Sequence, residues 1–147
     1  MWELFSTDAG TSGFRLHYME LLNWGTFNGE VVRIAPEGNN ALLTGANASG
    51  KSTFIDALLT LLVPMQRKRF YNQSSGVEKK GDRSEETYVL GHYGNILKEG
   101  SVSTTSQMLR HKSEVYSVLL ASFANINQKV VTLFQLRWFS NGELRRS

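Results

Sequence analysis

The sequence predicts a mixed α/β domain built around a phosphate loop. Residues 45–53 read Gly-Ala-Asn-Ala-Ser-Gly-Lys-Ser-Thr and contain the complete motif G-x-x-x-x-G-K-[ST]. Residues 41–44 form a strand-like run directly before the motif, and residues 54–62 form an apolar, helix-like run directly after it. The motif is specific only between a strand and a helix, and this chain supplies that context. The context favours a phosphate loop over a chance match.

The phosphate loop has the chemistry to hold a nucleotide. Its glycines permit backbone conformations in which successive N–H groups turn toward phosphate oxygens at the start of a helix. Lys51 is expected to reach the β- and γ-phosphates, Ser52 to bind Mg²⁺, and Thr53 to help hold the α-phosphate. The expected cofactors are therefore ATP and Mg²⁺. The candidate nucleotide-binding residues are Gly45, Ala46, Asn47, Ala48, Ser49, Gly50, Lys51, Ser52 and Thr53.

Strands are expected before the phosphate loop, after a flexible leader over residues 1–13. Residues 14–18 alternate apolar and polar side chains, as a half-buried strand does, and the expected strand continues through residue 22. Residues 31–34 read Val-Val-Arg-Ile, three of them apolar and β-branched, and they are flanked by turn residues, which predicts a second strand. With residues 41–44 as a third strand, the expected order is three strands, the phosphate loop and a helix.

The pattern is less regular after that helix, which is apolar on nearly every face and which Pro64 ends. Residues 72–84 are polar enough to form a long loop, and residues 85–94 fit a short helix or the end of a strand. Two β-rich runs, residues 115–123 and 129–139, flank a short polar turn and predict an antiparallel hairpin. No closing element is expected after this hairpin.

The composition is that of an ordinary soluble globular domain. The chain has 147 residues, 41% of them hydrophobic, which is enough for one domain with a core. It contains no cysteine, so disulfides and thiolate metal sites are excluded, and a reducing cytoplasm fits. No apolar run reaches the roughly 18 residues of a membrane helix, and the first residues lack a signal-peptide pattern. We expect a cytoplasmic protein without a membrane partner.

Positive charge concentrates after the phosphate-loop helix. Residues 65–83 contain six basic and two acidic residues, whereas the whole chain carries a formal charge of only +3. Such a segment fits contact with a nucleic-acid backbone or with a bound nucleotide. It fits a solvated loop equally well, because most charge runs are exposed faces.

Two further groups of residues are interpreted as structural. His17, His92 and His111 are far apart in the sequence and have no acidic partner at metal-ligand spacing, which favours surface or core histidines. Trp24 and Phe27 stand at a turn and could stack on bases, but packing against the first strands is the favoured interpretation.

Several segments together resemble a known family, the SMC-like (structural maintenance of chromosomes) ATPases. The likeness is to the N-terminal half of the ATPase head, in particular to the MukB-like group and most of all to the SMC-like subunit of Wadjet plasmid-defence systems. It covers about residues 14–140. The segments that carry it are Phe14-Arg15-Leu16, Leu21-Leu22-Asn23-Trp24-Gly25-Thr26-Phe27, Asn40-Ala41-Leu42-Leu43-Thr44-Gly45, the phosphate loop, Asp56-Ala57-Leu58, Leu61-Leu62-Val63-Pro64, Arg67 and Tyr88-Val89-Leu90-Gly91-His92-Tyr93.

The resemblance implies a P-loop NTPase head of ABC/SMC type, with a mixed β-sheet around the phosphate-loop helix. Members of this family bind ATP between two heads, each assembled from an N-terminal and a C-terminal segment that a long coiled coil separates. Hydrolysis then reshapes coiled coils that hold DNA. The implied partners are a C-terminal head segment, a second head, kleisin-type accessory subunits and DNA. On this view residues 14–147 are an incomplete head, which binds MgATP without turning it over.

The resemblance also separates the residues that are present from those that are missing. The sequence has no Leu-Ser-Gly-Gly-type signature and no apolar strand that ends in Asp-Glu, so the catalytic set is incomplete. Asp56, one turn into the helix, and Glu78, in the basic segment, are not assigned to these roles. Gln135 is the candidate for the family's Mg²⁺-binding glutamine, although it shares a strand face with Arg137 and also fits a surface position. Arg67 is the candidate for a nucleotide-contacting arginine.

Two other functions remain open. A RecF-like or other ABC-type DNA-repair ATPase would share the phosphate loop but carry a short helical insert in place of a long heptad-bearing one. A stand-alone nucleotide-binding module would regulate a partner without turnover.

Overall fold

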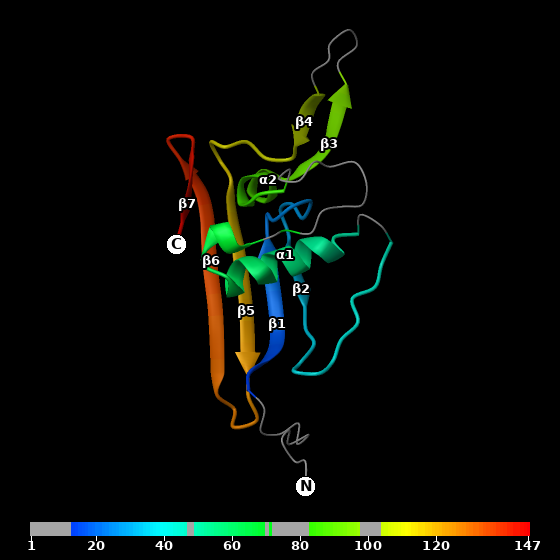
Figure 1. The fold of residues 1–147 in the computed structure, drawn as a ribbon, viewed down its shortest axis with the longest axis vertical. Coiled ribbons are helices and arrows are strands. Elements are labelled where there is room, and N and C mark those ends of the chain that lie inside the picture. The colour runs from blue at the N-terminus through cyan, green and yellow to red at the C-terminus, as the bar shows by residue number, and fades with distance from the viewer. Residues whose placement is uncertain (1–12, 47–48, 70, 72–82, 98–103) are drawn as a thin grey trace.

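The computed structural model describes residues 13–46, 49–69, 71, 83–97 and 104–147, which form two antiparallel sheets and a small number of helices (Figure 1). The larger sheet has the strand order β2-β1-β5-β6-β7, and the smaller one pairs β3 with β4. The strands are β1 (Arg15–Leu22), β2 (Val31–Ile34), β3 (His92–Leu97), β4 (Thr104–Met108), β5 (Tyr116–Ala124), β6 (Val130–Ser140) and β7 (Glu143–Arg146). Of the expected leader, only Gly13 belongs to the described residues.

The helix after the phosphate loop, α1 (Lys51–Leu62), lies across one face of the larger sheet and contacts β5 and β6 (Figure 1). The predicted helix is confirmed, and it begins at the motif lysine, a few residues before the predicted start. It ends at Leu62 just before Pro64, as expected. A short 3₁₀ turn, η1 (Gln66–Lys68), follows it, and a second helix, α2 (Glu85–Leu90), packs near the same sheet face. No helix among the described residues has the length and apolar character needed to cross a membrane.

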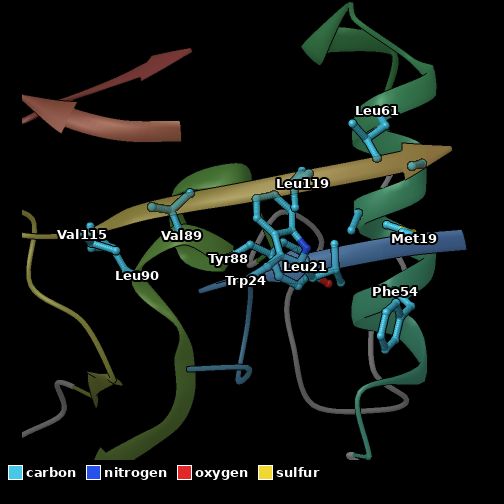
Figure 2. Close-up of a cluster of buried hydrophobic side chains, with 12 residues drawn as sticks. Met19, Leu21, Trp24, Phe54, Leu61, Tyr88, Val89, Leu90, Val115 and Leu119 are labelled. Atoms are coloured by element: carbon cyan, nitrogen blue, oxygen red, sulfur yellow. The ribbon is translucent and has the colours of Figure 1, made fainter. Parts of the chain in front are cut away.

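The core fills the space between the larger sheet and the two α-helices (Figure 2). Trp24, at the turn after β1, is fully buried, and its ring stacks on that of Tyr88 with 4.9 Å between the ring centroids. The structural interpretation of Trp24 is therefore confirmed. The other buried apolar residues are Met19, Leu21, Phe54, Ala57, Leu61, Val89, Leu90, Val115, Leu119 and Ala121.

The elements after α1 agree with the sequence-based predictions only in part. The predicted hairpin is confirmed as β5 and β6, which pair antiparallel from Tyr116 opposite Trp138 to Ala124 opposite Val130. The ambiguous residues 85–94 contain both alternatives, because α2 ends at Leu90 and β3 begins at His92. Most of the expected loop at residues 72–84 lies outside the described residues.

The predicted strand at residues 41–44 is wrong for this structure. The segment belongs to no sheet, and the Leu42 side chain is 87% exposed. A strand is stabilised by hydrogen bonds to a neighbouring strand and by burial of its apolar face. Among the described residues no strand pairs with this segment, so neither contribution is available to it.

The expectation that nothing closes the chain after the hairpin is also wrong, because β7 extends the sheet beyond β6. Asn141 and Gly142 have φ values of 52° and 77° and form the two-residue turn between them. A hairpin turn of this kind requires positive φ at both central residues, and Asn-Gly is the favoured pair. Phe139 then lies opposite Leu144 across the two strands.

Candidate phosphate-binding site

The N-terminal end of α1 carries the candidate residues of the phosphate loop. Asn47 and Ala48 lie outside the described residues, and the other candidates lie within them. Gly50 occupies the N-cap position with φ 91° and ψ 6°, and no side chain caps the helix. The first amides of a helix have no partner inside it, and the first turn of α1 contains no acidic side chain. This helix end therefore favours an anion.

Both motif glycines stand where a larger residue would not fit. A Cβ atom on Gly50 would lie 2.5 Å from Cζ of Phe27, and one on Gly45 would lie 2.6 Å from Oγ of Ser49. The Phe27 ring also contacts that of Phe54, with 5.2 Å between the centroids. The turn after β1 thus packs directly against the loop, and the loop backbone stays bare at both glycines, as a phosphate cradle requires.

The motif lysine curls back over its own loop. Lys51 Nζ donates hydrogen bonds to the carbonyl oxygens of Gly45, at 2.5 Å, and Ala46, at 2.7 Å, and contacts Ser49 Oγ at 3.4 Å. The ammonium group is therefore held within the curve of the loop, close to the helix N-terminus. The next residue, Ser52, is exposed, so its hydroxyl is accessible to a ligand. The donor set of this site, an ammonium, the first amides of α1 and the hydroxyl of an exposed serine, fits a metal-bound phosphate chain.

Thr53 links the loop to the same turn. A Cβ atom on Gly25 would lie 2.8 Å from the Thr53 methyl group, so backbone and side chain are in close contact here. Gly25 has φ 59°, which an L side chain rarely adopts, and this allows the close approach. The contact fixes the position of the first turn of α1 relative to β1.

Of the two outlying candidates, Gln135 is not brought to the loop. Gln135 is half-buried on β6 and its Nε2 donates to the carbonyl oxygen of Thr60 at 3.4 Å. Thr60 lies eight residues along α1 from Ser52, which corresponds to about 12 Å at 1.5 Å per residue. Arg67 belongs to η1, beyond the far end of α1, and its side chain lies outside the described part of the structure.

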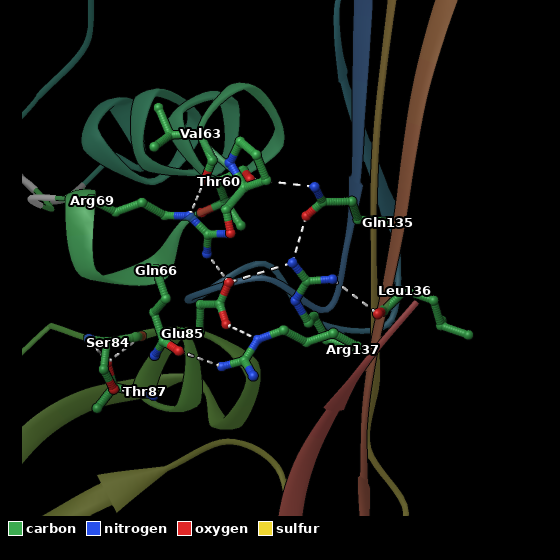
Figure 3. A network of polar contacts seen from close by, with 12 residues as sticks. Thr60, Val63, Gln66, Arg69, Ser84, Glu85, Thr87, Gln135, Leu136 and Arg137 are labelled. Atoms are coloured by element: carbon green, nitrogen blue, oxygen red, sulfur yellow. Dashed lines mark hydrogen bonds and ion pairs between the residues drawn. The ribbon is translucent and has the colours of Figure 1, made fainter.

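A buried polar cluster near that far end was not predicted (Figure 3). Glu85 is fully buried and accepts hydrogen bonds from Arg69, from Arg146 Nε at 2.6 Å and from Arg137 Nη2 at 3.4 Å. Burial alone raises the pKa of Glu85, but the Arg146 hydrogen bond and the charges of the three guanidinium groups outweigh it and hold the pKa below its usual value. The cluster joins the segment after α1 to α2, β6 and β7.

The same cluster helps to explain which face of β6 is buried. Gln135 and Arg137 share one face, as predicted, and this face, which also carries the core-packed Leu133 and Phe139, turns toward α1, while Val130 and Phe134 on the other face are exposed. Arg137 is drawn inward because Glu85 lies there. Alternation along a strand shows which residues share a face, but it does not show which face is inside when the core contains a charge.

Asp56 also has a structural environment. Its carboxylate is buried, accepts a hydrogen bond from the Tyr88 hydroxyl and lies 3.9 Å from Arg83 Nη1. Burial and this carboxylate together raise the pKa of Tyr88. Asp56 therefore connects α1 to α2. The other acidic residue considered, Glu78, lies outside the described residues.

The histidines lie on separate elements. His17 is exposed on β1, His92 is half-buried at the start of β3, and His111 is exposed after β4. Within the described ranges no three His, Asp or Glu side chains are grouped closely enough to hold a metal ion.

Comparison with known proteins supports the loop assignment. A family model described as the P-loop containing region of an AAA domain matches residues 16–78, from β1 through α1 and beyond. The predicted fold class, an α/β P-loop domain, is thus confirmed. A solved structure described as "Structural biochemistry of ATP-driven dimerization and DNA stimulated activation of SMC ATPases" is 18% identical, with a TM-score of 0.48, over 90% of this chain and 68% of that chain. No curated protein matches this chain.

Proposed function

We propose that this chain binds the phosphates of MgATP at the loop formed by residues 45–53. The observation that carries the proposal is the N-terminal end of α1, where uncapped amides, the left-handed Gly50 and the Lys51 ammonium meet. A bound phosphate group would accept from the amides that the helix leaves unpaired. The family-model match to a P-loop region supports the same proposal.

Five described residues of the loop have a role in this proposal. Lys51 would exchange its carbonyl contacts for the β- and γ-phosphate oxygens and neutralise their charge. The exposed hydroxyl of Ser52 would hold Mg²⁺, and Thr53 would support the α-phosphate. When bound, Mg²⁺ supplies charge neutralisation to the phosphate oxygens. Gly45 and Gly50 would keep the cradle open, because a side chain on either would collide with its neighbours.

Calorimetric titration with MgATP tests this proposal on the variant Lys51→Ala. We expect the dissociation constant to rise by about 100-fold or more, or about 2.7 kcal/mol, because the phosphates lose their only mobile cation in the loop. The matched control is Lys68→Ala, which removes an exposed lysine from η1 at the far end of α1. The control should bind like the unsubstituted chain. Equal affinities for both variants would contradict the proposal.

We further propose that this unit is the N-terminal segment of an SMC-like ATPase head that a second segment completes. An apolar surface on α1 supports this, since Ile55 and Leu62, which are 49% and 52% exposed, lie seven residues apart on one helix face. Residues 41–44 add two exposed leucines in a segment that pairs with no described strand. A second sheet that paired with residues 41–44 and packed on α1 would cover both.

The resemblance supports the wider role that we propose. In that role ATP pairs two heads, kleisin-type subunits accompany them, and the assembly acts on DNA in the cytoplasm, in plasmid defence or chromosome organisation. The chain alone should bind MgATP without hydrolysing it, because its sequence has no signature motif and no catalytic Asp-Glu pair. Phosphate release by the purified chain above that of Lys51→Ala would contradict this last statement.

A further inference from the structure

Among the described residues, Arg110, two residues after the end of β4, has the side chain with the most hydrogen bonds. Its side chain is buried, and all five N–H groups of the guanidinium have an acceptor. Three acceptors belong to the turn after β1 and two to the C-terminal end of α2. They are Gly25 O at 2.8 Å, Phe27 O at 3.0 Å, Asn28 Oδ1 at 3.1 Å, Tyr88 O at 2.9 Å and Val89 O at 2.7 Å.

Every one of these acceptors is uncharged. Among the described residues no ion pair joins Arg110 to a carboxylate, and burial lowers its pKa to about 10, so the group stays charged at neutral pH. Burying a cation that only dipoles hold costs desolvation free energy. We therefore take the hydrogen-bond geometry of Arg110 as the reason for its presence. A planar fork with five donors is a geometry that only arginine provides.

The turn that Arg110 holds is the one that packs on the phosphate loop. Gly25 and Phe27, whose carbonyl oxygens accept from Arg110, are in contact with Thr53 and Gly50, respectively. The packing around the guanidinium is tight on the other side as well, because a Cβ atom on Gly91 would lie 2.8 Å from Arg110 Nη2. A continuous line of contacts therefore runs from the end of β4 through the turn to the first turn of α1.

We propose that Arg110 is a positioning residue for nucleotide binding, which fixes the turn at residues 24–28 and thereby holds Phe27 and Gly25 against the phosphate loop. The inference rests on the proposed binding of MgATP at residues 45–53. It adds a residue far from the motif in sequence to the determinants of phosphate affinity. It also links the β3–β4 sheet, which leads directly into Arg110, to the shape of the loop.

The test compares Arg110→Lys with Arg137→Lys in calorimetric titrations with MgATP. Lysine keeps the charge but has three N–H donors on one nitrogen, so it cannot make all five hydrogen bonds that the guanidinium makes to the turn and α2. Arg137 is the matched control because it is also a buried arginine but belongs to the Glu85 cluster at the other end of α1. At a temperature where circular dichroism shows both variants folded, we expect Arg110→Lys to weaken binding about tenfold and Arg137→Lys to change it less than about twofold.

A double variant separates positioning from general destabilisation. If Arg110 acts through Phe27, the variant Arg110→Lys/Phe27→Leu should bind about as weakly as the weaker single variant. Losses that multiply, or an unchanged affinity for Arg110→Lys, would overturn the inference while the proposed function stands. Failure of the unsubstituted chain to bind MgATP would overturn both.

A milder variant covers the case in which Arg110→Lys does not fold. Asn28→Ala removes one acceptor of Arg110 at an exposed position of the turn. It should weaken MgATP binding several-fold, and an unchanged affinity would overturn the inference.

Discussion

Gly50 shows how much of the phosphate loop depends on one residue. Two separate properties converge there, a left-handed backbone with φ 91° and a Phe27 ring carbon 2.5 Å from the place of a Cβ atom. Either property alone disfavours a side chain. Together they explain why this chain needs glycine at the N-cap position of α1.

A matched pair of variants separates these two properties. Gly142, at the β6–β7 turn, also has a positive φ of 77°, but nothing lies within 4 Å of its Cβ position. Gly142→Ala should lower the free energy of unfolding by about 1–2 kcal/mol through backbone strain alone. Gly50→Ala should lower it further, because the Phe27 ring must move, and should abolish MgATP binding. Urea unfolding and calorimetry check both, and an equal loss of stability in the two variants would contradict the contact with Phe27.

Single residues were predictable from the sequence only where a motif fixed them. The phosphate loop has a fixed spacing that reflects its chemistry, so its residues could be assigned from the sequence alone. Glu85 and Arg110 belong to no motif, and each acquires its role from partners that the fold brings together from distant segments. Before the fold is known, each is one charged residue in an otherwise irregular stretch.

Among the secondary-structure elements, β7 contributes to the interior of the protein through one side chain, that of Arg146. Arg146 places its guanidinium on the buried carboxylate of Glu85, and it also contacts Gln66 of η1 at 2.9 Å. Its neighbour Arg145 pairs with Glu143 in solvent. The short strand therefore completes an interior cluster from the edge of the sheet.

Arginine-to-alanine variants at these two neighbours test that role. Arg146→Ala should lower the free energy of unfolding by about 1–2 kcal/mol, because it removes a charge-assisted hydrogen bond to a buried carboxylate. Arg145→Ala should change it by less than about 0.5 kcal/mol, since exposed ion pairs contribute little. Urea unfolding at neutral pH measures both. Equal effects would show that β7 stabilises the fold without the Glu85 contact.

The elements predicted correctly are those whose signal is local. Helix α1 and the β5–β6 hairpin follow from the apolar run after the motif and from two β-rich runs around a short turn. The errors at residues 41–44 and at β7 both concern pairing, which depends on a neighbour elsewhere in the chain. Residues 41–44 have a strand pattern but pair with no described strand. The short charged segment Glu143–Arg146 pairs with β6, because the Asn-Gly turn places it beside that strand.

At the scale of the whole molecule, α1 is buried on one side only. Leu61 is 5% exposed toward the sheet, whereas Ile55 and Leu62 remain about half exposed on another face. Apolar surface of this kind on a helix is typical of an element that packs between two layers. Only one of those layers is present in the described residues.

The uncovered side of α1 should make the purified chain associate with itself. Replacing both Ile55 and Leu62 with glutamate should suppress this association and leave the free energy of unfolding within about 0.5 kcal/mol, as for other surface changes. Sedimentation velocity over a range of concentrations measures the effect. The control Leu61→Glu should unfold the chain, because it buries an unpaired charge. If the double variant associates as strongly as the unsubstituted chain, another surface is responsible for the association.

The pairing of β1 with β5 has a consequence for biosynthesis. Leu21 lies opposite Leu119, so the centre of the larger sheet joins residues about 100 positions apart. Ribosomes add about 5–20 residues per second, and β5 therefore emerges about 5–20 s after its partner. From the completion of α1 until then, this apolar helix lacks β5 and β6, the strands that it contacts, and has only the β1–β2 pair of the larger sheet, so the nascent chain depends on shielding from its surroundings.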